Sequence, residues 1–214
     1  MANANTTDIR YEMDNRRPVR IFVGLKVAPE IASELAGLAV DLKKFAVRLV
    51  AAADIHLTLV PPWDEESISD ALEKLRLVAS RFCAFSLMFQ RVGYGPQPRR
   101  PRLLWAECTA SDEIVALRAA LLEAYCQSDE RPFRPHVTLA RIRGNGFAIA
   151  RKHPIDRELS LTQRVESIVL FQSPPPGGSG YHILASVRLG ETAQSAPTAT
   201  SATFLSPSSR SNSL

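Results

Sequence analysis

Two copies of one short pattern constrain this chain more than any other feature of its sequence. The copies are His56-Leu57-Thr58-Leu59 and His136-Val137-Thr138-Leu139. Both lie in runs whose residue types and alternation predict a β-strand. Because successive side chains of a strand point to opposite faces, each copy presents an imidazole and a hydroxyl on one face and anchors two apolar residues on the other. The fold must therefore hold two such strands, and across a cleft they would enclose one volume.

A similar order of elements surrounds each copy. In the first half we predict strands over 19–27, 46–51 and 55–60, the last ended by Pro61-Pro62, and helices from Pro29 through Leu42 and over 65–81 with Asp64 as N-cap. In the second half we predict a hairpin of 82–92 and 102–109, a helix from Ser111 to about 126, a strand over 135–143 and a final pair over 164–172 and 180–189. The repeated order predicts a duplicated α+β fold.

The composition divides the sequence into three parts. Residues 1–17 are polar, and residues 191–214 hold 11 Ser or Thr among 24, so we predict that both segments are disordered. Residues 18–190 form the predicted domain, with two pseudo-symmetric lobes. No apolar signal segment opens the chain and no apolar run reaches membrane-spanning length. We therefore expect a cytoplasmic monomer that makes no contact with a membrane.

Two imidazoles and two hydroxyls around one volume suit the cleavage of a phosphodiester. Attack of water on phosphorus needs a base and the departing sugar oxygen needs an acid, and an imidazole with a pKa of about 6.5 can serve as either. Thr58 and Thr138 can donate hydrogen bonds to the nonbridging oxygens, and arginine can add positive charge. Because two imidazoles can move both protons and no further ligands of a known spacing are present, we expect no metal and no cofactor.

Net charge and missing motifs narrow the classes of function. The net charge is +4 and the pI is about 9.2, with arginines gathered in 91–102 and 131–151, which fits a polyanionic ligand. The sequence has no G-x-x-x-x-G-K-[ST] motif, so we expect no use of ATP, and no G-x-S-x-G elbow for a nucleophilic hydrolase. Three widely spaced cysteines argue against a disulfide framework and offer no C-x-x-C metal pair.

The two motifs resemble those of the 2H phosphoesterase superfamily, and most closely its RNA 2′,3′-cyclic phosphodiesterase branch, also called the 2′-5′ RNA ligase family. The resemblance covers about residues 19–189 and is carried by VRIFVGLKVAPE, DIHLTLVPPW, PQPRRPRLLWAE, RPFRPHVTLARIR and VESIVLFQSPPPGGSGYHIL. The first motif departs from the pattern, because Val60-Pro61-Pro62-Trp63 stands where this branch commonly continues with Phe-Leu-Gly. The departure changes the neighbouring pocket wall and with it the expected substrate preference.

The resemblance implies a fold, a reaction and a set of site residues. It implies a bilobal α+β fold in which two antiparallel sheets flank a central cleft, with helices outside. It implies hydrolysis of a 2′,3′-cyclic phosphate at an RNA end to a 2′-phosphate, and the reverse joining to a 5′-hydroxyl as a 2′-5′ linkage. By the same resemblance His136 is the base that activates water, His56 is the acid, and Arg141 contacts phosphate. Simple alternation, however, places Arg141 on the face opposite His136.

Four further residues lie near the motifs and are candidates for nucleotide contacts. Trp63 follows the first motif and Phe133 precedes the second, so either ring could stack on a terminal base, as aromatic side chains do in proteins that bind single strands. Arg131 and Arg134 could hold backbone phosphates. The alternative for each is a structural aromatic ring or a solvated surface charge.

Two other functions remain open from the sequence. The altered stretch after the first motif would also fit a 2H phosphodiesterase that acts on 2′-5′ oligoadenylate or small cyclic nucleotides. A non-catalytic RNA-binding module of the α+β type is the second alternative, although the paired aromatic signature of a base-stacking sheet is missing. In that case the duplication would have kept a structural hydrogen-bond pattern without catalysis.

Overall fold

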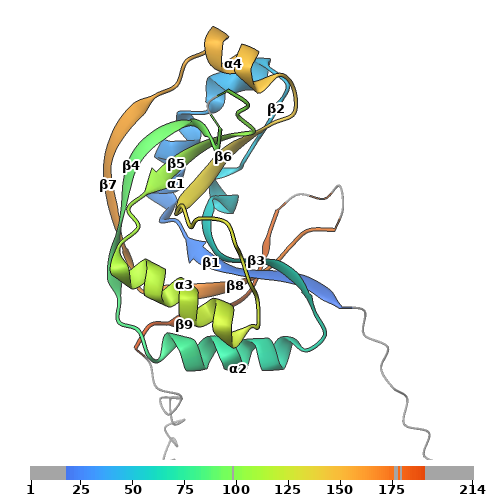
Figure 1. Cartoon of the computed structure of the whole chain (residues 1–214), viewed down its shortest axis with the longest axis vertical. Helices are drawn as coiled ribbons and strands as arrows, with labels where there is room; N and C mark the ends of the chain where they lie inside the picture. The colour runs from blue at the N-terminus through green and yellow to red at the C-terminus, as the bar shows by residue number, and fades with distance from the viewer. Residues whose placement is uncertain (1–17, 98, 176–177, 179, 191–214) are drawn as a thin grey trace, which may run out of the picture.

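Strands with long buried stretches account for most of this fold, which a computed structural model describes for residues 18–97, 99–175, 178 and 180–190. The predicted disordered segments 1–17 and 191–214 lie outside the described residues. Nine strands pair antiparallel in the described part of the chain, in the order β7-β4-β5-β6-β3-β1-β8-β9 with β2 beside β6 (Figure 1). Their bounds are β1 Val19–Lys26, β2 Val47–Leu49, β3 His56–Glu65, β4 Phe85–Gly95, β5 Leu103–Cys108, β6 His136–Ile142, β7 Arg157–Val165, β8 Ser167–Gln172 and β9 His182–Arg188.

The sheet consists of two halves that meet at one residue pair. Strands β7, β4, β5 and β6 form one half, and β3, β1, β8 and β9 form the other. Between β3 and β6 the register records a single pair, Leu57 with Val137, and both side chains are fully buried. The α+β class and the antiparallel halves expected from the sequence are confirmed, with the difference that the two expected sheets are continuous at this pair.

Four helices and two short 3-10 turns complete the described chain. They are α1 Pro29–Gly37, α2 Ile68–Ala79, α3 Asp112–Ala124 and α4 Gly146–Lys152, with 3-10 turns at Val40–Lys44 and Ala52–Asp54. Helices α2 and α3 lie side by side, α2 against β8 and β9 and α3 against β3 (Figure 1). The first helix was predicted to extend through Leu42. It ends at Gly37, and Leu42 lies in the 3-10 turn that follows.

Strand β3 does not end at Pro61-Pro62, which corrects the sequence prediction. The register steps from Val23 opposite Val60 to Ile21 opposite Trp63, so both prolines lie in an irregular stretch of the ladder. On its other side β3 pairs with β6 only at Leu57, and the missing proline N–H groups therefore cost no ladder bond there. The strand continues to Glu65.

Two other predictions need correction. Asp64 is not the N-cap of the second helix, because the chain is still extended there; Ser67 is the cap, and its Oγ accepts from the Asp70 N–H at 3.3 Å. The expected strand 164–172 is divided between β7 and β8, and β7 and the short helix α4 were not predicted. Ser111 does precede its helix, as predicted.

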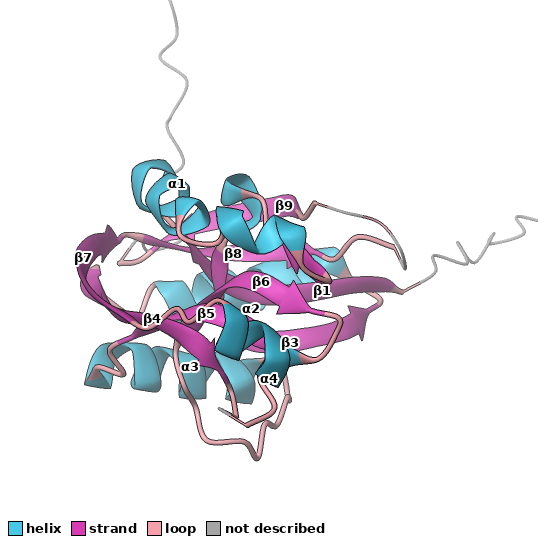
Figure 2. Cartoon of the chain, turned by 90° about the horizontal axis from the view of Figure 1, so that it is seen from above, coloured by secondary structure: helices cyan, strands magenta, loops and turns pink. Residues whose placement is uncertain are grey.

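The edge strand β7 curves back toward the start of α1 (Figure 2). Gln163 makes the connection: its Oε1 accepts from the Ala28 N–H at 2.9 Å, and its Nε2 donates to the Lys26 carbonyl at 3.0 Å. Gln163 is the one polar residue counted among the buried side chains of the described part of the chain. The Gln163 amide thus pairs with backbone groups at the end of β1 that have no partner strand there. In this way the edge strand β7 is connected to β1 in the middle of the sheet.

Candidate active site

The pairing of β3 with β6 brings the two His-x-Thr motifs together. The strands run antiparallel, with Leu57 opposite Val137, so His56 lies on the side of Thr138 and Thr58 on the side of His136. Leu57 and Val137 point into the core. By alternation, both histidines and both threonines therefore share the opposite face of the sheet. The structure thus brings the four residues predicted from the motifs to one face.

Each motif is followed by a β-bulge at the same position. Opposite β1, the register steps from Thr58 to Val60 and leaves Leu59 as the extra residue. Opposite β5, it steps from Thr138 to Ala140 and leaves Leu139 extra. The extra residue restarts the alternation, so consecutive residues are buried on both strands. The sequence pattern did not reveal these bulges.

The second bulge moves Arg141 to the face of His136, which corrects the prediction from simple alternation. Arg141 pairs with Leu103, which shares a face with Trp105, the partner of Thr138. The positive charge of Arg141 is a cause of the lowered pKa of both His56 and His136. One guanidinium therefore acts on both imidazoles, as a ligand for a phosphate between them would.

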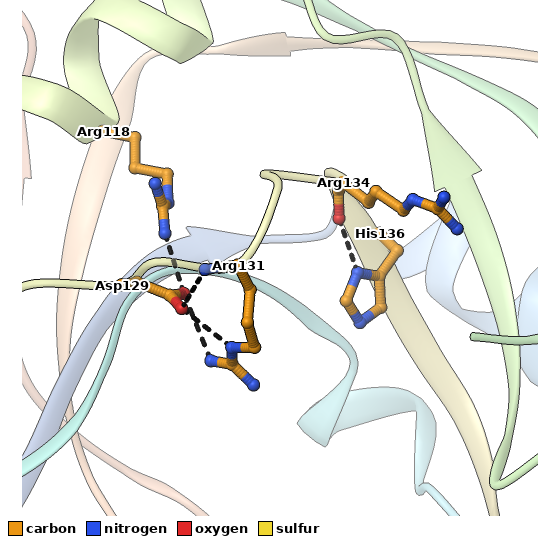
Figure 3. Close-up of polar contacts among 5 residues, drawn as sticks. All are labelled: Arg118, Asp129, Arg131, Arg134 and His136. Carbon is orange, nitrogen blue, oxygen red and sulfur yellow. Dashed lines mark hydrogen bonds and ion pairs between the residues drawn. The ribbon is translucent and has the colours of Figure 1, made fainter. Parts of the chain in front are cut away.

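The two imidazoles are oriented in the same way. His56 Nδ1 lies 2.7 Å from the Asp54 carbonyl oxygen, and His136 Nδ1 lies 2.7 Å from the Arg134 carbonyl oxygen. A carbonyl oxygen can only accept, so in each ring Nδ1 carries the proton. Nε2 is then the nitrogen that exchanges protons: it is a base in the neutral ring and an acid in the charged ring. The hydrogen bond of His136 is drawn in Figure 3.

Three aromatic rings surround His56. The ring centroids of Phe22 and Tyr181 are each 4.8 Å from that of His56, and the centroid of Phe171 is 5.4 Å away. Burial lowers the pKa of His56, the hydrogen bond to Asp54 opposes this, and the charges of Arg141 and His136 lower the pKa further. The charge of His136 is the smallest of these effects on His56.

His136 has a different environment. Its ring lies on that of Trp105, with centroids 4.4 Å apart, and Gly95 permits this packing because a Cβ there would lie 2.4 Å from the Trp105 ring. Burial lowers the pKa of His136, and the hydrogen bond to Arg134 and the carboxylate of Glu107 raise it. Glu107 is the cross-strand partner of His136. The carboxylate favours an imidazolium on this side of the site.

A pocket of about 630 Å³ opens beside His136. Thr58, Pro61, Pro62 and Trp105 contribute to its lining, and the loop before β6 contributes Arg131, Phe133 and Arg134. Arg118 of α3 also lines it and lies over the Phe133 ring, 4.6 Å from its centroid. Phe133 and Arg134, the predicted nucleotide contacts, therefore line the same pocket as His136.

Four predicted site residues do not line this pocket, namely His56, Thr138, Arg141 and Trp63, and of these Trp63 also packs away from the two histidines. Its ring packs against Tyr125, with centroids 4.8 Å apart, and its Nε1 donates to Glu65 Oε2 at 3.0 Å. Tyr125 is buried and donates to the Ala71 carbonyl at 2.7 Å. Trp63 therefore packs against the residues that follow α3 rather than at the histidines.

Among the described residues, no three His, Cys, Asp or Glu side chains lie together in a way that could hold a metal ion. No helix in this part of the chain is both long and apolar enough to cross a membrane.

Comparison with known proteins places this arrangement in a family. Residues 29–173, more than half of the chain, match the model of the 2′-5′ RNA ligase superfamily. The chain belongs to this superfamily. The resemblance expected from the motifs is thereby confirmed. A relative within the 2′-5′ RNA ligase superfamily is the RNA 2′,3′-cyclic phosphodiesterase of Bacillus subtilis, 30% identical over 136 residues that span 60% of this chain and 74% of that protein.

Solved structures show the same 2H phosphoesterase fold. E. coli LigT complexed with 3′-AMP is 25% identical with a TM-score of 0.62, and the match covers 81% of this chain and 99% of LigT. A Thermus thermophilus protein at 23% identity has a TM-score of 0.68 and matches over 80% of this chain and 98% of its own, which supports the fold alone.

Several site residues were not predicted from the sequence. Phe22 and Phe171 lie on β1 and β8, where nearly every residue is buried, so the pattern could not distinguish core rings from rings at the site. Glu107 follows Trp105 by two residues, and only the pairing with β6 reveals its position. Arg131 was a candidate for a phosphate contact, but Asp129 was not considered, because its pairing with Arg131 depends on the loop conformation.

Proposed function

We propose that this chain is an RNA 2′,3′-cyclic phosphodiesterase that hydrolyses cyclic phosphate ends to 2′-phosphates, with His56 and His136 as its acid–base pair. The observation that carries the proposal is the matched pair of imidazoles. Both rings are oriented by a carbonyl two residues before them, both lie on one face with a threonine, and both are reached by the charge of Arg141. The name of the Bacillus subtilis relative supports the substrate class.

The proposed step moves one proton at each histidine. Nε2 of His136 takes a proton from water as the water oxygen attacks phosphorus, and Glu107 stabilises the resulting imidazolium. The bond between phosphorus and the 3′-oxygen breaks, and His56 donates the proton on its Nε2 to that oxygen. The 2′-oxygen keeps the phosphate. Thr58 and Thr138 hydroxyls and the Arg141 guanidinium stabilise the charge on the nonbridging oxygens.

His56 must carry a second proton, on Nε2, before the reaction, although burial lowers its pKa. The negative charge of a bound phosphate favours the imidazolium and raises the pKa again. We therefore propose that substrate binding charges His56. With a 5′-hydroxyl in place of water as the nucleophile, the same step would form a 2′-5′ linkage, which an RNA with both end groups would reveal as a longer product.

The decisive experiment uses a short RNA that ends in a 2′,3′-cyclic phosphate, incubated in EDTA with wild type, His56→Ala and His136→Ala. General acid–base catalysis contributes roughly 10²–10⁴-fold, so each variant should lose about that factor while wild type yields a 2′-phosphate. His182→Ala is the matched control, since His182 is exposed on β9 and should retain full activity. Full activity of both motif variants would favour the RNA-binding module, and restoration by zinc after EDTA would contradict a metal-independent reaction.

A further inference from the structure

A ladder of three charged side chains forms one wall of the pocket beside His136 (Figure 3). Arg118 Nη2 lies 2.8 Å from Asp129 Oδ2, and the two side chains are only 12% and 13% exposed. Arg131 pairs with the same carboxylate through two bonds, from Nε to Oδ1 at 2.7 Å and from Nη2 to Oδ2 at 3.1 Å. The Arg131 side chain is 78% exposed.

This ladder fixes a cation at the pocket. Two guanidinium groups face one carboxylate, so one positive charge remains uncompensated. A largely buried pair such as Arg118 with Asp129 is costly to desolvate and contributes little stability by itself. The two hydrogen bonds that Arg131 donates to Asp129 hold its guanidinium in one orientation. The guanidinium therefore loses less entropy when it binds an anion. The pairing uses only part of the five N–H donors of Arg131.

Arg131 and Arg141 occupy different places relative to the histidines. Arg141 shares the sheet face of His136, and its charge acts on both imidazoles. A phosphorus atom attacked between the imidazoles is therefore the partner of Arg141. Arg131 instead lies on the loop before β6 and lines the pocket, which Arg141 does not, and the pocket volume of about 630 Å³ has room for a nucleoside in addition to a cyclic phosphate.

We propose that Arg131 binds the phosphate on the 5′ side of the terminal nucleoside, so that the enzyme prefers ends carrying this phosphate to plain nucleoside 2′,3′-cyclic phosphates. This inference rests on the proposed function, because it assumes that a cyclic phosphate lies between His56 and His136. It names the substrate class more narrowly: a strand, or a nucleotide with a 5′-phosphate. Arg131 is thereby a specificity residue that takes no part in proton transfer.

The test compares uridine 2′,3′-cyclic phosphate with and without a 5′-phosphate. Wild type should show at least about a tenfold higher kcat/KM with the 5′-phosphate, as one charge-assisted contact would give. Arg131→Gln should reduce this ratio to about one, because only the substrate with the 5′-phosphate makes the contact, whereas a change in the pKa of His136 would affect both substrates alike. Arg131→Lys should give an intermediate ratio, because it keeps the charge and loses the two-bond pairing with Asp129. Arg76→Gln, which removes an exposed arginine of α2, should keep the full ratio.

Salt dependence gives a second measurement. With a short single-stranded RNA substrate, the slope of log kcat/KM against log salt should become shallower by about 0.7 in Arg131→Gln, the value for one phosphate contact. Equal use of both uridine substrates by wild type, or an equal loss on both in Arg131→Gln, would overturn the role of Arg131 while leaving the proposed reaction intact. No turnover of any cyclic phosphate by wild type would instead reject the proposed function.

Discussion

Glu107 distinguishes two histidines that the backbone otherwise presents alike. Burial lowers the pKa of His136 and the Glu107 carboxylate raises it, whereas the charges that act on His56 are those of Arg141, Asp54 and His136. If His136 is the base, it must be neutral in the free enzyme, so its pKa sets the acidic limb of kcat/KM. We predict that Glu107→Gln lowers this pKa and moves the acidic limb to lower pH. A pH profile measured between pH 4.5 and 9 checks this.

The control for Glu107 removes a carboxylate elsewhere. Glu73→Gln on the exposed side of α2 should leave both limbs in place. If the acidic limb of Glu107→Gln stayed in place or moved to higher pH, His136 would not be the group that sets it, and the assignment of base and acid would have to be exchanged.

Removal of the Arg141 charge should change the pKa of both imidazoles. Its charge lowers the pKa of His56 and of His136, so Arg141→Gln should move both limbs of the pH profile to higher pH. Loss of one group that stabilises the transition-state charge should also lower kcat by roughly 10²–10³-fold. Arg151→Gln, at an exposed position of α4, provides the comparison. A shift of only one limb would mean that Arg141 faces one histidine alone.

Gly24 is the residue through which β1 approaches the motif strand β3. It pairs with Thr58, and a Cβ at this position would lie 2.4 Å from the Leu57 carbonyl oxygen. Because backbone cannot yield as a flexible side chain can, we predict that Gly24→Ala lowers the free energy of unfolding by about 1–3 kcal/mol. It should also lower activity, since Leu57 holds the contact with β6.

Urea unfolding measures this loss, with Gly37→Ala as the matched control. Gly37 ends α1 and has no atom within 4 Å of an added Cβ, so alanine there should be neutral or slightly stabilising. Equal stability of the two variants would show that β1 and β3 can separate without cost.

Most elements were predictable from the length and spacing of their apolar runs. β1, β3, β6 and the hairpin of β4 and β5 are apolar runs of strand length, and α2 and α3 carry apolar residues at helical spacing. The bulges were not predictable, because Leu59-Val60 and Leu139-Ala140 read as ordinary strand interior. β7 was missed although Leu159, Leu161 and Val165 share one spacing, because polar residues interrupt the run and Gln163 takes the remaining inward position. The face of the sheet on which Arg141 lies therefore could be determined only from the strand register.

The whole molecule should be less stable in mild acid. Burial holds the pKa of His56 and of His136 below the value of about 6.5 that they have in an unfolded chain. Below that value the unfolded chain binds more protons than the folded one, so the free energy of unfolding is greatest above pH 6.5 and falls as the pH drops through the lowered pKa values. Thermal unfolding between pH 8 and pH 5 should show a falling Tm.

Two comparisons assign this loss to the site. His56→Gln combined with His136→Gln should flatten the dependence of Tm on pH within that window. Inorganic phosphate should offset the loss in wild type, since a bound anion favours the two imidazolium groups. An undiminished dependence in the double variant would assign it to other groups.

The order of strands in the sheet determines when each half can be completed during synthesis on the ribosome. The half containing β1 and β3 is completed only by β8 and β9, and the other half has β7 at its edge, so the last quarter of the described chain supplies both outer edges of the sheet. Neither half is one continuous stretch of polypeptide. During synthesis both motif strands emerge before the edge strands β7 and β9 and before β8, so the two halves of the sheet are completed nearly together, after β6.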